Sequence, residues 1–435
     1  MNHAVAFEVK GWCPGALKPM QSGDGLIVRV RPRCGMFSLD QLAVLADAAG
    51  RFGNGHIDLT RRANLQIRGV GEENLAGLQD VIGSLGLLDP TPEQESVRNL
   101  LISPLAGIDP AEVLDIRGIV GELAGMLASE QALWALPSKF GFVVDGCGTL
   151  TLADERADIR LAAIRNGAAP AVVVGLDTQA GIEWLGSVSP ATAAAAAGEA
   201  ACAFLKVMSN GTRQRMRDLS AEGLASIRSA MKRTLDPLMR DPRKINVSRD
   251  RRVGLLDLGS GRFAVGVAAP FGRVETDQLR KLAGEMAAFG VKQIRLSPWR
   301  ILYAEVPGAS AGNAILDAAS AAGFIAESCD PLLRIEACPG APACRSTSLD
   351  TRGDARRLAE LLPRFGFEGT VHVSGCAKGC ARSDAADLTL VGADGFYGIV
   401  RSGTAQDRPA LRCSFAALVA DPGAIFASVE GRHHD

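Results

Sequence analysis

The sequence lacks a strong net charge, a long apolar run and a targeting leader. The formal net charge of its 435 residues is −1, so bulk charge predicts neither nucleic-acid nor membrane binding. No apolar run approaches the roughly 20 residues of a membrane span, since stretches such as 101–108 and 171–176 are far too short. The first residues contain neither a basic leader region nor an Arg-rich amphipathic stretch, so we expect a cytoplasmic protein.

A nucleotide-binding fingerprint is missing too. Gly259-Ser-Gly261 is not followed by a third glycine at the required spacing, so no flavin or nicotinamide module is visible. Histidines are few, and we expect structural or surface roles for them, although His56 and His372 stay open as ligands. The five histidines are His3, His56, His372, His433 and His434.

Four of the ten cysteines stand at the spacing of metal ligands. Cys338 and Cys344 enclose five residues, and Cys376 and Cys380 enclose three. Two loops that each carry paired thiols would form the four-thiolate pocket that a [4Fe-4S] cluster needs. Glycine and proline keep both loops out of regular structure and free backbone N–H groups for hydrogen bonds to sulfur.

Three alternatives to a cluster stay open. Zinc prefers pairs separated by two to four residues, disulfides need an oxidising compartment, and free cysteines are often buried packing residues. A cluster implies electron transfer, so we expect a redox enzyme that takes electrons from NADH through a separate reductase or ferredoxin. Simple packing suits the remaining cysteines, which are Cys13, Cys34, Cys147, Cys202, Cys329 and Cys413.

The sequence also contains a long-range internal repeat. Asp40-Gln41-Leu42 recurs in the second half of the chain as Asp277-Gln278-Leu279, inside an ungapped set of matches that runs from 28 to 60. The shared pattern predicts a strand over 26–31, a helix over 39–52 and a second strand over 57–67. Farther along, 98–107 resembles 334–342, and Ser103 stands where Cys338 stands. Short apolar segments can match by chance, but the repeated order predicts a duplicated chain in which only the C-terminal copy holds a cluster.

This pattern predicts an α+β fold with internal pseudo-twofold symmetry. We expect a first ferredoxin-like half at 1–85, a first lobe without cluster cysteines at 90–235, a second half at 255–320 and a cluster-binding lobe at 328–430.

Basic residues gather on the expected strands of the first half and just before an apolar stretch at 142–144. Guanidinium groups bind carboxylates bidentately, so this set could bind a polyanion, although a solvated strand face with salt bridges is the alternative. The residues are Arg29, Arg31, Arg61, Arg62, Arg68 and Lys139.

Together these motifs resemble the nitrite and sulfite reductase superfamily, and within it the precorrin-3B synthases. The cluster spacing, Thr60-Arg-Arg62-Ala-Asn-Leu-Gln66 and Leu136-Pro-Ser-Lys139-Phe140 are similar to superfamily elements. The segment from Trp12-Cys-Pro-Gly15 to Gly25 is similar to the start of the synthases. The resemblance implies two joined ferredoxin-like halves and two lobes around a cavity, a [4Fe-4S] cluster on the four cysteines, and in reductases a bridge to sirohaem iron at the position of Cys380.

The resemblance also implies a reaction. Precorrin-3B synthases act on precorrin-3A, inserting one oxygen atom from O2 at C20 and closing a γ-lactone in aerobic cobalamin biosynthesis. Here the cluster would feed a further iron centre, whose ligands the sequence does not identify. Arg62 and Lys139 would be catalytic, and substrate binding would use Arg29, Arg31, Arg62, Gln66, Arg68 and Lys139.

Two other functions stay open. A sirohaem-dependent sulfite or nitrite reductase is the first, although reductases carry a second basic residue where this chain has Gly141, and the repeat of the Thr-x-Arg element reads Ser297-Pro-Trp-Arg300. A non-catalytic tetrapyrrole-binding protein with a structural cluster is the second.

Overall fold

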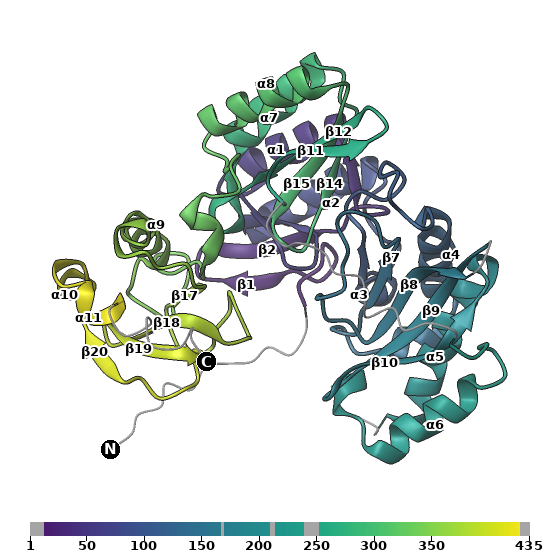
Figure 1. Ribbon diagram of the computed structural model, residues 1–435. Coiled ribbons are helices and arrows are strands. Elements are labelled where there is room, and N and C mark those ends of the chain that lie inside the picture. Colours follow the sequence, from purple (N-terminus) through teal and green to yellow (C-terminus); the bar gives the residue numbers. More distant parts are fainter. Residues whose placement is uncertain (1–12, 167–168, 209–213, 239–251, 427–435) are drawn as a thin grey trace.

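A central pair of α/β halves carries two lobes (Figure 1). The structure is a computed structural model that describes residues 13–166, 169–208, 214–238 and 252–426. The C-terminal lobe, coloured yellow, and the first lobe, coloured teal, lie on opposite sides below the paired halves in Figure 1. Among the described helices, none has both the length and the apolar composition needed to cross a bilayer.

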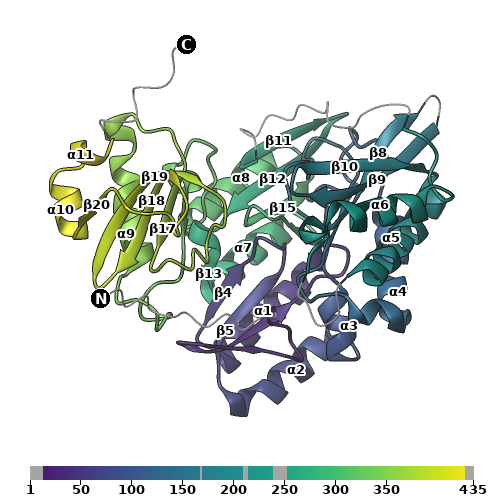
Figure 2. The ribbon, with the colours of Figure 1, turned by 90° about the horizontal axis from the view of Figure 1, so that it is seen from below.

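The two halves exchange one strand each. Strand β13 of the second half pairs antiparallel with β4 of the first, as Figure 2 shows, and β3 of the first half pairs antiparallel with β14 of the second. The first sheet has the order β1 (Met20–Ser22), β2 (Gly25–Val30), β5 (Leu65–Val70), β4 (His56–Leu59) and β13 (Arg273–Glu275). The second has the order β11 (Gly254–Gly259), β12 (Arg262–Ala268), β15 (Ile301–Val306), β14 (Gln293–Leu296) and β3 (Met36–Ser38).

Helices from both halves share one core. The first half supplies α1 (Leu39–Phe52) and α2 (Leu75–Ser84), and the second supplies α7 (Thr276–Ala288) and α8 (Ala309–Ala321). Helices α1 and α7 pack against each other, and the apolar faces of the helices and both sheets form one continuous cluster. Burial of each large aliphatic side chain contributes about 1.5–3 kcal/mol, so the shared core strongly favours the joined arrangement.

Backbone details confirm the predicted pseudo-twofold symmetry. Helix α1 begins with a capping box between Ser38 and Gln41, and α7 begins with the same arrangement between Glu275 and Gln278. Left-handed backbone angles also recur at equivalent positions of the repeat, at Cys34 and Phe271 and again at Ala63 and Arg300. Such angles are uncommon outside glycine, so their repetition at matched positions reflects one backbone design used twice.

The two lobes share one sheet topology. In each, two parallel strand pairings are followed by two antiparallel ones. The first lobe has β6 (Leu100–Ile102), β7 (Phe142–Asp145), β8 (Ile159–Asn166), β9 (Ala169–Thr178) and β10 (Gly181–Val188), with α3 (Pro92–Val97), α4 (Arg117–Ser129), α5 (Ala193–Val207) and α6 (Ala221–Met231). The C-terminal lobe has β16 (Ile335–Ala337), β17 (Val371–Ser374), β18 (Ala386–Ala393), β19 (Phe396–Gly403) and β20 (Leu411–Cys413), with α9 (Thr351–Leu361), α10 (Phe415–Ala420) and α11 (Gly423–Phe426).

One element prediction is wrong. The segment 57–67 is not a single strand, because β4 ends at Leu59 and β5 begins at Leu65. The hydroxyl of Thr60 accepts the backbone N–H groups of Arg62 and Asn64, which closes a turn between the two strands. The side chains of Arg61 and Arg62 therefore project from a turn rather than from a strand.

Candidate active site

Neighbouring parallel strands bring the two cysteine loops to the same sheet edge. Strand β16 ends one residue before Cys338, β17 ends two residues before Cys376, and the two strands pair in parallel. The backbone N–H of Gly375 donates to Sγ of Cys338 at 3.2 Å, so the loops touch. An N–H···S contact of this kind is one that would stabilise a cluster thiolate.

The thiol of Cys380 lies close enough to the other three cysteines to interact with their charges. Burial raises the pKa of Cys380 to about 11, Lys378 opposes this, and Cys338, Cys376 and Cys344 each add to the increase. Across the described residues, no three His, Cys, Asp or Glu side chains are close enough to ligate a single ion. Zinc would need every sulfur at about 2.3 Å from one metal, whereas each thiolate of a [4Fe-4S] cluster binds its own iron. The donor set therefore fits a cluster better than zinc.

The first lobe closes the equivalent space with a carboxylate. Ser103 occupies the place of Cys338, and its Oγ accepts the N–H of Gly146 at 2.9 Å, as Sγ of Cys338 does from Gly375. The same hydroxyl donates to the buried carboxylate of Asp145, which also accepts the N–H groups of Cys147 and Leu152. Asp145 thus accepts the hydroxyl of Ser103 and two backbone N–H groups of the loop that corresponds to the second cysteine loop.

A second acid beside this loop should make stability pH-dependent. Burial raises the pKa of Glu112 to about 7 despite the N–H of Gly107, and Asp109 adds to the increase. A raised folded-state pKa contributes stability at low pH that is lost as pH rises from about 4.5 to about 7. We expect E112Q to raise the melting temperature at pH 8 and to change it little at pH 5. The exposed E122Q on α4 is the control, and an equal effect of E112Q at both pH values would contradict the assignment.

The turn between β4 and β5 reaches both lobes. Arg61 forms an ion pair with Glu336 of the C-terminal lobe at 3.4 Å. Arg62 points to the first lobe, where a Cβ added to Gly141 would lie 3.3 Å from its Nη1. Burial, followed by the nearby charge of Arg215, lowers the pKa of Arg62. Its guanidinium forms no ion pair with the described residues, so it can bind an external anion.

Three other predicted residues also form no ion pair within the part of the chain that the structure describes. Arg29 on β2 is buried, and its Nε has no hydrogen-bond partner in the described chain. Gln66 lies opposite Arg29 in the ladder between β2 and β5 and is partly exposed. Lys139 is exposed in the loop before β7, and no ion pair joins it to a described residue. Arg29, Arg62 and Lys139 therefore carry cationic charge that a polyanion could neutralise.

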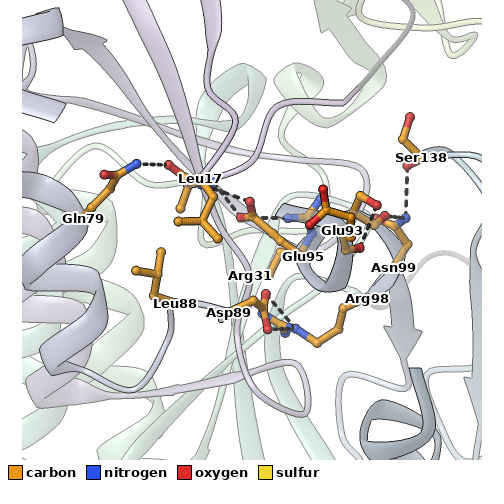
Figure 3. A network of polar contacts seen from close by, with 12 residues as sticks. Leu17, Arg31, Gln79, Leu88, Asp89, Glu93, Glu95, Arg98, Asn99 and Ser138 are labelled. Atoms are coloured by element: carbon orange, nitrogen blue, oxygen red, sulfur yellow. Dashed lines mark hydrogen bonds and ion pairs between the residues drawn. The ribbon is translucent and has the colours of Figure 1, made fainter. Parts of the chain in front are cut away.

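The other two predicted arginines have internal partners. Arg31 is an ion-pair partner of Glu95 at 3.1 Å, and the same carboxylate accepts the N–H groups of Ala16 and Leu17 (Figure 3). Arg68 donates to Asp24 at 2.7 Å and to Ser22 at 3.0 Å, which holds the tip of the β1–β2 hairpin. That tip lies against the first cysteine loop, where Ser22 donates to the carbonyl of Ala343. Both arginines therefore hold the N-terminal segment in place.

A pocket between the paired halves and the C-terminal lobe contains site residues that the sequence does not reveal. Its empty volume is about 650 Å³, and its cationic groups are Arg61, Arg252 and Arg300. The Arg252 guanidinium lies over the Trp299 ring at 3.8 Å, and Glu336 is the one carboxylate in the lining. No sequence signal marks Arg300, because its counterpart in the repeat is Ala63. The surplus of cations favours an anionic ligand with an apolar body.

A related pocket lies on the opposite side of the pseudo-twofold. It is lined by Cys34, Gly35 and Ala63, which correspond to Phe271, Gly272 and Arg300 of the first pocket. Its arginines are paired internally: Arg98 and Arg33 with Asp89, and Arg31 with Glu95, and Figure 3 shows the Arg98 and Arg31 pairs. In the described chain, Arg300 of the first pocket has no ion pair. Of these two pockets, the one beside the C-terminal lobe therefore has an arginine, Arg300, that forms no ion pair with the described residues.

The histidines differ in their environment. His56 is partly buried at the start of β4, where burial and Arg273 lower its pKa. His372 on β17 is fully buried. His3, His433 and His434 lie outside the described residues.

Known proteins with similar sequences and structures support this fold. Residues 18–85 match the model of the nitrite/sulfite reductase ferredoxin-like half domain. The chain is 25% identical to a ferredoxin–nitrite reductase of Leptolyngbya laminosa over 88% of this chain and 79% of that protein. Its fold is similar to that of the Mycobacterium tuberculosis NirA protein, with a TM-score of 0.73 at 22% identity over 91% of this chain and 79% of that one. The predicted duplicated nitrite/sulfite reductase-like α+β fold is therefore confirmed.

A more similar relative defines the family. The chain is 35% identical to a precorrin-3B synthase of a Sinorhizobium species over 419 residues, which cover 93% of this chain and 85% of that protein. The reductases are more distant, at 24–26% identity. The chain therefore belongs to the precorrin-3B synthase family, within the nitrite and sulfite reductase superfamily.

Proposed function

We propose that this protein is an O2-dependent monooxygenase that converts precorrin-3A to precorrin-3B. One atom of O2 enters at C20 of the macrocycle, and the ring A acetate closes a γ-lactone. The second oxygen atom leaves as water, with two electrons from an external donor and two protons. The 35% identity to a precorrin-3B synthase over 93% of the chain carries this proposal.

Cys338, Cys344, Cys376 and Cys380 are proposed as ligands of a [4Fe-4S] cluster, which when bound supplies electrons one at a time. The touching loops and the Gly375 N–H directed at Cys338 support this ligand set. A cytoplasmic location is proposed as well, because a reducing compartment keeps the cluster thiols reduced before assembly. NADH is proposed as the ultimate reductant, through a separate reductase or ferredoxin.

The substrate is proposed to bind through its acetate and propionate carboxylates. Arg29, Arg62 and Lys139 form no ion pair with the residues that the structure describes, and Arg61 and Arg300 add guanidinium groups beside the C-terminal lobe. Several such contacts would orient the macrocycle so that one meso carbon among four is presented, and fixed geometry can supply several kcal/mol toward that choice. Arg31 and Arg68 would act indirectly, by holding the N-terminal segment, whose Ser22 contacts the first cysteine loop.

Anion reduction is the less favoured alternative. Position 141 has no side chain, whereas reductases carry a second basic residue there, and a Cβ added at Gly141 would lie 3.3 Å from Nη1 of Arg62. With less positive charge, the site would stabilise the oxyanion of sulfite or nitrite poorly.

Anaerobic purification separates these functions. The proposed synthase should contain cluster iron and acid-labile sulfide without stoichiometric sirohaem, and should consume O2 only when precorrin-3A is present. A reductase would retain sirohaem and oxidise a reduced dye when sulfite or nitrite is added. A tetrapyrrole carrier would bind precorrin-3A without turnover, even with electrons and O2 supplied.

Arg62→Ala tests the proposed substrate contact. We expect binding of precorrin-3A to weaken about 10- to 100-fold, since a hydrogen bond to a charged group contributes about 1.5–3 kcal/mol. Anaerobic titration of cluster-loaded protein would measure the affinity, and the cluster absorbance should stay unchanged. R228A is the control, because Arg228 forms a surface ion pair with Glu183 in the first lobe. Equal affinities for R62A and the unmodified protein would remove Arg62 from the site.

A further inference from the structure

His372, on the strand that precedes the second cysteine loop, is a buried polar residue without a hydrogen-bond partner in the described chain. It is 0% exposed, and neither ring nitrogen has a hydrogen-bond partner in the described chain. A buried donor or acceptor without a partner costs about 1–3 kcal/mol, so an orphaned imidazole indicates a partner that the polypeptide itself does not supply.

The ring of His372 lies against the second cysteine loop. On β17, Val371 and Val373 pack into the apolar core of the lobe, so the alternation of the strand places His372 on the opposite face. There its Cε1 lies 3.7 Å from the Cβ position of Gly379, the residue before Cys380. His372 also lies beside Glu336 and Thr389 in the strand ladder, and Glu336 is ion-paired with Arg61 and Arg382.

The surroundings favour a neutral imidazole facing an anion. Burial, together with Arg382 and Arg300, lowers the pKa of His372 to about 4. A neutral imidazole has one N–H donor. The cluster core with its four thiolates is an anionic acceptor, and hydrogen bonds to its sulfurs set its potential.

We propose that His372 is a positioning residue that donates a hydrogen bond to a sulfur of the iron–sulfur core and raises its reduction potential. The N–H group stabilises the reduced core, which carries one more negative charge, more than the oxidised core. This inference rests on the proposal that the four cysteines hold the cluster. In this role His372 changes the reduction potential of the cluster, without ligating iron or contacting the substrate.

The experiment is a dye-mediated redox titration of the purified, cluster-loaded full-length protein, followed by electron paramagnetic resonance. We expect H372L to keep its iron and acid-labile sulfide but to have a more negative midpoint potential. H372Q keeps an N–H donor and should recover part of the difference. T389V is the matched control, because Thr389 is also 0% exposed in the same ladder but donates to the carbonyl of Gly403.

The outcomes separate this inference from the proposed function. An unchanged midpoint in H372L, or an equal shift in H372L and T389V, would overturn the hydrogen bond to the cluster. Loss of iron from both H372L and H372Q but not from T389V would also overturn it, because glutamine retains a donor. Absence of iron and sulfide from the unmodified protein would instead refute the cysteine ligand set.

Discussion

Replacing Cys344 with serine is expected to abolish the cluster and, with it, all O2 consumption in the presence of precorrin-3A. A serine hydroxyl does not ionise near neutral pH, so one iron would lose its thiolate. Cys344 is partly exposed and hydrogen-bonds through its backbone N–H to the carbonyl of Gly340, so the loop itself should tolerate the hydroxyl. Iron and acid-labile sulfide counts after anaerobic purification, with the absorption spectrum, measure the effect.

C329S is the control for this replacement. Cys329 is exposed and lies outside both cysteine loops, so its thiol should be dispensable. Its iron and sulfide content should equal that of the unmodified protein. Full iron and sulfide in C344S would show that the ligand set is wrong.

Replacing Asp58 with asparagine is expected to destabilise the protein by about 3–5 kcal/mol, because it leaves the largely buried Arg273 and Arg352 without their counter-charge. Asp58 on β4 is an ion-pair partner of three arginines from three parts of the chain: Arg68 of the first half, Arg273 on β13 and Arg352 on α9 of the C-terminal lobe. Its loss should therefore loosen the joint between both halves and the lobe. Chemical denaturation at neutral pH measures the change in the free energy of unfolding.

Protonation of Asp58 at low pH should also destabilise the protein. The neighbouring arginines, Arg352 foremost, hold the pKa of Asp58 at about 2 against the opposing effect of burial. A depressed pKa contributes stability above the unfolded value near 3.9, and this stability is lost as pH falls toward 2.

D47N is the control for D58N, since Asp47 pairs with Arg280 at the surface and should contribute less than about 1 kcal/mol. Similar losses in D58N and D47N at neutral pH would contradict the role of Asp58 as a joint.

Much of the architecture could be predicted because the sequence states it twice. The two segments that match in sequence also share capping boxes and left-handed residues at equivalent positions in the structure. The helix expected over 39–52 has those bounds. The strand expected over 57–67 failed because apolar residues continue through the turn. Leu59, Ala63 and Leu65 are all buried, so their pattern does not reveal that the chain reverses at Thr60.

The internal partners of the arginines could not be predicted. Glu95 lies far beyond Arg31 in the sequence, and Asp24 lies far before Arg68, so no local spacing links either pair. Residue type alone does not distinguish Arg31 and Arg68 from Arg29 and Arg62. The exchange of β3 and β13 between halves depends on tertiary packing, and so does the orphaned environment of His372.

Oxygen uptake under ¹⁸O2 by the reduced, cluster-loaded protein after addition of precorrin-3A tests the proposed monooxygenase activity. We expect one O2 to be consumed per product, with a single ¹⁸O atom in a lactone-containing tetrapyrrole. No uptake with precorrin-3A, together with oxidation of a reduced dye on addition of sulfite or nitrite, would contradict it.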